Sequence, residues 1–222
     1  MLKDRKEAGR KLAARLRRFK SESPVVLALP RGGVVVGYEV ARALAAPLDI
    51  VVVRKLGAPG QPELAVGALA DGDPPEEVLN EDAIAMLGVS REYLDGEIAR
   101  QLAEIRRREA CYRGNRPPQS VRDHTAIVVD DGIATGASMR AALRGVRRAE
   151  PGRLVLAVPV APRDTIESLR AEVDDVVCLS TPAVFLSVGL HYQDFSQTDD
   201  EEVIALLSRA RIGALAIGGT IS

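Results

Sequence analysis

The chain has 222 residues, enough for one substantial α/β domain, and 46% of them are hydrophobic, as in an ordinary globular core. Aromatic residues make up only 3%, and the formal net charge is −1, which argues against a nucleic-acid-binding surface or a general attraction to anionic membranes. Two cysteines and two histidines at unrelated positions argue against a disulfide framework or a zinc site. No apolar stretch is long enough to cross a bilayer. We therefore expect a soluble, cytoplasmic protein.

Strands and helices alternate along the predicted chain. Apolar residues at helical spacing predict helices, and short runs of β-branched residues predict buried parallel strands. The expected elements are, in chain order, a helix over 4–20, a strand over 24–29, a helix over 34–46, a strand over 48–53, a short strand over 64–69 within a Gly/Pro-rich loop at 57–75, a helix over 90–112, a strand over 125–131, a helix over 136–149, a strand over 153–160, a helix over 163–173, a strand over 175–180, an irregular stretch over 181–197 and a helix from about Asp199. This order predicts an α/β fold with a mostly parallel sheet and helices on both faces.

Ligands of such sheets bind beyond the carboxyl ends of the strands, where two segments stand out. PRGG (30–33) follows the first strand, and DDGIATGAS (130–138) follows the strand over 125–131. The small residues of the second segment are Gly132, Ala134, Gly136 and Ala137. Because they carry almost no side chain and precede a helix, a phosphate can approach the backbone amides at the helix N-terminus. Thr135 and Ser138 add hydroxyl donors.

Two carboxylates precede this phosphate-binding loop. Asp130 and Asp131 are suited to accept hydrogen bonds from hydroxyl groups about one sugar away from the phosphate. The segment therefore predicts a phosphorylated sugar with a free diol as ligand.

The stretch IVVDDGIATGAS (127–138) resembles the phosphoribosyl pyrophosphate motif of the type I phosphoribosyltransferases. ALPRGGVVVGYEVA (28–41) resembles the pyrophosphate loop of the same family, in which Arg31, Gly32 and Gly33 would face the anion. The resemblance implies a type I phosphoribosyltransferase fold with a small hood and a long extra helix. It also implies one domain over 1–222, with hood or insert segments at about 71–120 and 180–198.

The activity that the resemblance implies is transfer of the 5-phosphoribosyl group from phosphoribosyl pyrophosphate to a nitrogenous acceptor such as a nucleobase, with release of pyrophosphate. Mg²⁺ would bind with the pyrophosphate of the substrate, without a dedicated set of protein ligands. Asp130 and Asp131 would orient the diol, and the backbone from Ala134 to Ser138 would bind the 5′-phosphate. The cations for the leaving pyrophosphate would be Arg31, Arg54 and Lys55. Glu63 would lie in the mobile loop that closes over the site; it is either a catalytic acid or an exposed loop charge.

The segment 180–198 resembles the hood that covers the acceptor base in this family. Phe185 and Val188 would pack on the ring, and the backbone near Val188 and Gly189 would read its edge; core packing of these residues is the alternative. Relatives that use 6-oxopurines carry an acid where this chain has Ala134, which argues weakly against hypoxanthine or guanine. The whole chain resembles a bacterial subgroup that often has Gln-Trp in place of Leu190-His191, so the acceptor stays open.

A second interpretation is a non-catalytic regulatory protein of the same fold that binds phosphoribosyl pyrophosphate. A basic strip keeps this alternative open; it consists of Arg106, Arg107, Arg108, Arg113 and Arg116. A phosphoribosyl hydrolase or a pyrophosphokinase is less favoured, because the chain lacks the two-domain length of the latter. The expected partners are phosphoribosyl pyrophosphate and a small nitrogenous base. We expect the helix over 90–112 to pack beside the active site or at a homodimer contact.

Overall fold

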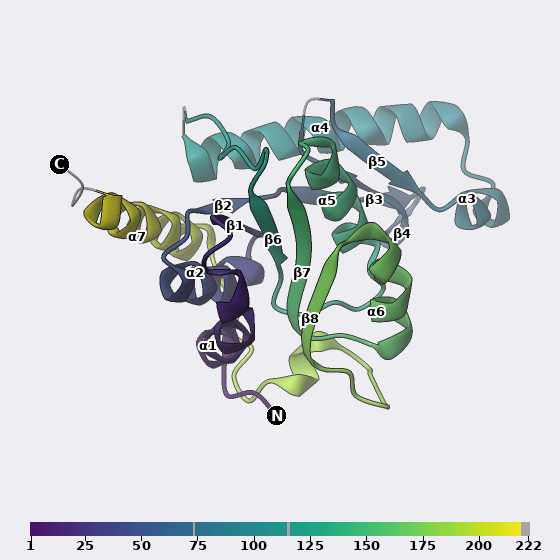
Figure 1. The fold of residues 1–222 in the computed structure, drawn as a ribbon. Helices are drawn as coiled ribbons and strands as arrows, with labels where there is room; N and C mark the ends of the chain where they lie inside the picture. Colours follow the sequence, from purple (N-terminus) through teal and green to yellow (C-terminus); the bar gives the residue numbers. More distant parts are fainter. Residues whose placement is uncertain (73, 115, 219–222) are drawn as a thin grey trace.

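The computed structural model describes residues 1–72, 74–114 and 116–218, apart from the side chains of Pro62, Glu63 and residues 213–218 (Figure 1). Its elements are α1 (Arg5–Leu16), the 3₁₀ turn η1 (Arg17–Phe19), β1 (Pro24–Ala28), α2 (Gly32–Leu44), β2 (Leu48–Ile50), β3 (Val53–Ala58), β4 (Gln61–Ala70), β5 (Glu76–Leu79), α3 (Glu81–Leu87), α4 (Arg91–Arg113), β6 (Thr125–Val129), α5 (Ala137–Arg148), β7 (Arg153–Val160), α6 (Arg163–Leu169), η2 (Arg170–Glu172), β8 (Asp175–Ser180), η3 (Val188–His191) and α7 (Asp200–Gly218). Among the helices described, none is long and apolar enough to span a membrane.

Five parallel strands form the main sheet, in the order β2-β1-β6-β7-β8. Neighbouring residues of a strand face opposite sides, so Val128 packs with α5 and α6 while Val129 packs with α1, α2 and α7. The predicted fold class is therefore confirmed. The strand order reverses between β1 and β6, and the crevice at such a reversal is where parallel α/β sheets bind ligands.

A second, antiparallel sheet of three strands was not predicted. The predicted strand over 48–53 is wrong in its second half, because β2 ends at Ile50 and β3 begins a new sheet at Val53. The predicted loop over 57–75 is wrong as well, because β3 and β4 form a hairpin that turns at Pro59 and Gly60. Gly67 lies inside this ladder, where a Cβ atom would come 2.7 Å from the Val78 carbonyl oxygen. A glycine in a strand thus marks a close backbone approach, not a loop.

The long helix α4 confirms the helix predicted over 90–112. Ser90 caps it, with the Tyr93 amide donating to Oγ at 3.2 Å. The helix packs on one face of the second sheet, and α5 fills the space between that sheet and the main one (Figure 1). Its length thus serves to cover β3 and β4. The homodimer and the domain boundaries stay predictions.

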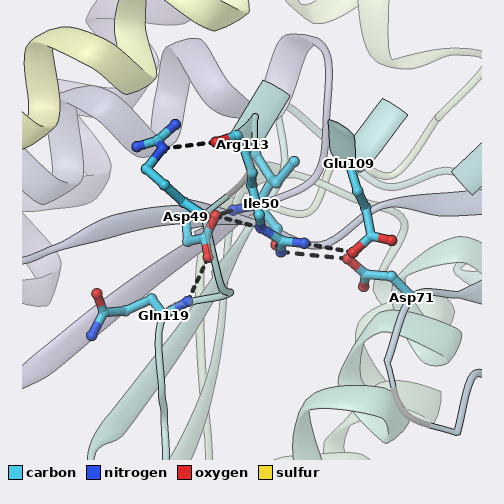
Figure 2. Close-up of polar contacts among 7 residues, drawn as sticks. Asp49, Ile50, Asp71, Glu109, Arg113 and Gln119 are labelled. Carbon is cyan, nitrogen blue, oxygen red and sulfur yellow. Dashed lines mark hydrogen bonds and ion pairs between the residues drawn. The ribbon is translucent and has the colours of Figure 1, made fainter. Parts of the chain in front are cut away.

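The end of α4 is tied to the main sheet by a buried ion cluster around Arg113 (Figure 2). Its guanidinium donates to Asp49 on β2 at 2.9 Å, to Glu109 at 2.6 Å and to the Ile50 carbonyl at 2.5 Å, with Asp71 at 3.5 Å. Only 8% of Arg113 is exposed, so three carboxylates share one buried cation. Burial is the main reason that the pKa of Asp71 rises to about 7 despite Arg113. Arg113 therefore belongs to the interior of the fold.

Candidate functional site

The two predicted segments meet at the switch point of the main sheet. The Leu29 amide donates to the Val129 carbonyl at 2.9 Å, which joins the ends of β1 and β6. A Cβ atom on Gly33 would lie 2.9 Å from Asp130 Oδ1, and one on Gly32 would lie 1.9 Å from Asp131 Oδ2. The peptide bond between Pro30 and Arg31 is cis. Only glycine permits the first segment to lie this close to the acids of the second.

Both segments lead into helices whose first turns have no side-chain cap. Neither α2 nor α5 has a side-chain acceptor at its N-cap position. The helices α1, α3 and α4 are capped by Asp4, Asn80 and Ser90, whereas α6, like α2 and α5, has no side-chain cap. Uncapped helix N-termini present free N–H groups and the positive end of the helix dipole, which favour anions. The site thus has two helix N-termini suited to an anion, one at each segment, and anion binding there stays a prediction.

Asp130 and Asp131 lie between these two positions. The Asp131 amide donates to Asp130 Oδ1 at 2.8 Å. Burial and the neighbouring Asp131 carboxylate raise the pKa of Asp130 well above its ordinary value. Burial also raises the pKa of Asp131, although Arg5 opposes this shift. Two desolvated carboxylates side by side are suited to bind hydroxyl groups and to attract a cation.

Arg5, at the start of α1, contacts this acidic pair and was missed by sequence reasoning. Its Nε donates to Asp131 Oδ2 at 2.7 Å, and its Nη1 donates to the Ser196 carbonyl at 2.7 Å. The guanidinium carbon lies 3.8 Å from the centre of the Phe195 ring. Arg5 and Asp131 are 126 residues apart, so no local motif links them.

The hood segment 180–198 is joined to the N-terminus, beside which it lies in Figure 1. The Leu2 amide donates to the His191 carbonyl, and the Gln193 amide donates back to the Leu2 carbonyl, both at 2.8 Å. The Tyr192 hydroxyl donates to the Asp131 carbonyl at 2.6 Å. The N-terminal residues and the hood segment therefore close one side of the site together.

Two of the predicted hood residues face different neighbours. Val188 reaches the phosphate loop, since a Cβ atom on Gly132 would lie 2.4 Å from Val188 Cγ1. The Phe185 ring instead stacks on His191, with the ring centres 5.1 Å apart. A Cβ atom on Gly189 would lie 3.0 Å from the Phe195 ring. Val188 is thus the predicted hood residue that the structure brings to the loop.

The phosphate loop itself is open to solvent at its tip. Ala134 and Thr135 are exposed, and Ala137 and Ser138 are half-buried. Gly136 is the N-cap of α5 with φ +83°, and a Cβ atom there would lie 2.8 Å from the Thr165 side chain. The loop is thus open to solvent at Ala134 and Thr135, while Gly132 and Gly136 are buried.

The predicted cationic side chains do not gather at the two segments. Arg31 directs its Nη1 toward Asp200 on α7, at 3.9 Å. Arg54 donates to Gln101 on α4 at 2.9 Å, and burial lowers its pKa. Lys55 is exposed on β3. Glu63 lies on β4, but its side chain is outside the described residues. The roles of these four residues stay predictions.

The comparisons with known proteins agree with this geometry. Residues 1–194 match the family model for the phosphoribosyl transferase domain. The chain belongs to the phosphoribosyl transferase family. Two Mycobacterium tuberculosis proteins, each called "Putative phosphoribosyl transferase", from strains CDC 1551 and H37Rv, are 46% identical to it over 207 residues, or 93% of this chain. The chain spans 46% of the length of these curated relatives, about half.

A solved structure extends the similarity to the backbone. The crystal structure of the protein TT1426 from Thermus thermophilus is 47% identical in sequence and has a TM-score of 0.78. The match covers 94% of this chain and 98% of that one. Together with the family model, this similarity confirms the family resemblance inferred from the two segments.

We expect Gly33→Ala to destabilise the protein by about 1–3 kcal/mol, because the new methyl group would overpack a contact between backbones. Its Cβ atom would lie 3.0 Å from Asp130 Cα and 3.1 Å from the Val129 carbonyl oxygen, neither of which can rotate away. Thermal unfolding measures the effect. Gly96→Ala on α4 is the control, since a Cβ atom there meets nothing within 4 Å. Equal melting temperatures for the two variants would contradict the close contact at Gly33.

Proposed function

We propose that the protein transfers the 5-phosphoribosyl group of phosphoribosyl pyrophosphate to a nitrogenous acceptor and releases pyrophosphate. The observation that carries this proposal is the pair of uncapped helix N-termini, α2 and α5, with Asp130 and Asp131 between them. Two anion positions separated by a diol acceptor match a ligand with a phosphate at one end, a diphosphate at the other and a ribose between them. Membership of the phosphoribosyl transferase family supports the same ligand.

The reaction displaces pyrophosphate from C1 of the ribose by a nitrogen nucleophile, through a transition state with oxocarbenium character. Amides from Ala134 to Ser138 bind the 5′-phosphate and supply binding energy remote from the bond that breaks. Asp130 and Asp131 orient the ribose hydroxyls. The amides at Gly32 and Gly33 stabilise the negative charge that develops on the leaving group. The hood excludes water, which would otherwise react at C1.

Mg²⁺ fits the donor set at this site. The two carboxylates are hard oxygen donors, and no cluster of three or more metal-ligating side chains occurs in the parts of the chain that the structure describes. Mg²⁺ is usually bound by one or two carboxylates together with substrate phosphates and water, so Asp130 and Asp131 would hold it only with the ligand present. Bound there, it would neutralise charge on the diphosphate.

The regulatory alternative is less well supported by the surroundings of the basic strip. Arg107 and Arg108 both pair with Glu104, and Arg113 is buried in the ion cluster. With these three charges paired within the protein, the strip offers less attraction to nucleic acid than its sequence indicates. This favours the transferase.

Titration calorimetry with phosphoribosyl pyrophosphate, with and without Mg²⁺, tests the proposal, followed by pyrophosphate release with a panel of purine and pyrimidine bases. We expect Mg²⁺-dependent binding and release with one base or a few related bases. Binding without release from any base would support the regulatory protein instead. The absence of binding would overturn both interpretations.

A further inference from the structure

Arg5 lies against both segments of the site although it belongs to neither. A Cβ atom on Gly32 would lie 2.7 Å from Arg5 Nε and 1.9 Å from Asp131 Oδ2. The ion pair of Arg5 with Asp131 therefore lies directly against the turn that the proposed function assigns to the diphosphate. The guanidinium of Arg31, in contrast, is directed toward α7.

The surroundings of Arg5 hold its guanidinium in one plane while leaving donors available. The side chain is only 11% exposed, and the Phe195 ring lies beneath it. A guanidinium has five N–H donors, and the contacts to Asp131 and the Ser196 carbonyl use two of them. A planar fork held in this way is suited to bind phosphate oxygens.

A cation near Asp130 and Asp131 would reduce their repulsion of a diphosphate. A diphosphate that approaches Gly32 and Gly33 comes close to Asp130 and Asp131, whose negative charges repel it. Before substrate binds, Arg5 offsets the charge of Asp131 at 2.7 Å. Once a ribose diol occupies the Asp131 carboxylate, the same cation lies within reach of the diphosphate attached to that ribose.

We propose that Arg5 is a substrate-binding residue that exchanges partners: it pairs with Asp131 before substrate binds and contacts the diphosphate of phosphoribosyl pyrophosphate afterwards. This inference rests on the proposed function and assigns to the N-terminal helix a role in holding the leaving group. It also explains why the hood and the first residues are joined, because the contacts at Ser196 and Phe195 place the guanidinium at the site.

The test compares Arg5→Gln, which removes the charge, with Arg5→Lys, which keeps it. Arg10→Gln is the matched control, since Arg10 is exposed on the same helix and the change in net charge is the same. Calorimetry measures three probes: inorganic pyrophosphate with Mg²⁺, ribose 5-phosphate, and phosphoribosyl pyrophosphate with Mg²⁺. Melting temperatures show whether each variant is folded.

For Arg5→Gln we expect affinity for pyrophosphate and for phosphoribosyl pyrophosphate to fall by about 10- to 100-fold, the range of a charge-assisted hydrogen bond. Affinity for ribose 5-phosphate should stay the same or rise, because Asp131 is released. Arg5→Lys should recover part of the pyrophosphate affinity, and Arg10→Gln should match the wild type.

Other results would overturn the inference in recognisable ways. If Arg5→Gln weakens binding of all three probes equally and Arg5→Lys does not restore it, Arg5 only holds the hood segment in place. If Arg5→Gln binds pyrophosphate as the wild type does and binds ribose 5-phosphate more tightly, Arg5 only blocks Asp131 and does not contact the diphosphate. A wild-type protein that binds none of the probes would overturn the proposed function itself, together with this inference.

Discussion

The double variant Asp130→Asn, Asp131→Asn should bind phosphoribosyl pyrophosphate with Mg²⁺ more weakly than the wild type by about 100-fold or more. Each carboxylate that is replaced contributes charged hydrogen bonds of about 1.5–3 kcal/mol. The stability of the double variant should not fall in parallel. A carboxyl group whose pKa is raised in the folded state destabilises the fold as the pH rises from its unfolded pKa through its folded pKa, and an amide at position 130 removes this penalty. The loss of the Arg5 partner opposes the gain, so we expect a melting temperature within a few degrees of the wild type.

Calorimetry and thermal unfolding of the same samples check this separation of binding from stability. The control is Asp164→Asn with Glu167→Gln, two exposed acids of α6 that give the same change in net charge. The control should bind as the wild type does. Unchanged affinity in the double variant at 130 and 131 would contradict the assignment of the ribose diol to these two carboxylates.

Arg113→Met should lower the free energy of unfolding by about 3–5 kcal/mol, because it leaves buried carboxylates without their cation. Asp49, Asp71 and Glu109 would then face one another across the end of α4 (Figure 2). Chemical denaturation measures the loss. The control is Arg107→Met, an exposed ion pair on the same helix, which should cost at most about 1 kcal/mol.

The loss of unfolding free energy in Arg113→Met, called the deficit below, should also depend on pH. A carboxyl group with a raised folded-state pKa contributes stability below its unfolded pKa and loses that contribution as the pH rises through the folded pKa. The pKa of Asp71 is already about 7 with Arg113 present, and removal of the cation raises it further. The deficit should therefore be larger at pH 8 than at pH 5. A deficit that does not change with pH would assign the cost to lost packing of the arginine stem.

The sequence could predict those parts of the candidate site whose residues lie within one short stretch of the chain. Residues 127–138 carry the strand, both acids and the small-residue loop, and the alternation of strands and helices places their end at the ligand-binding edge. The turn at 30–33 follows from the same rule. Local composition was sufficient here because one strand and one helix form each of these structures.

The parts that could not be predicted depend on contacts between distant residues. Arg5 lies in a predicted helix without any motif around it, and its partners Asp131 and Ser196 are 126 and 191 residues away. The family resemblance assigns both Arg54 and Lys55 to the pyrophosphate. On strand β3, however, adjacent side chains point to opposite faces, and Arg54 is directed to α4.

The joining of the N-terminus to the hood has a consequence for the order of folding. The loop over 130–138 joins β6 to α5 and contacts β7, α6 and Val188. The closed side of the site also requires Arg5 to meet a carbonyl 191 residues later. Closing so long a loop is entropically costly, and contacts between distant residues form slowly. On the ribosome, the contact between the first helix and the hood segment can form only after Ser196 has emerged. During synthesis, the acid with which Arg5 pairs therefore emerges before the carbonyl that holds Arg5 in place.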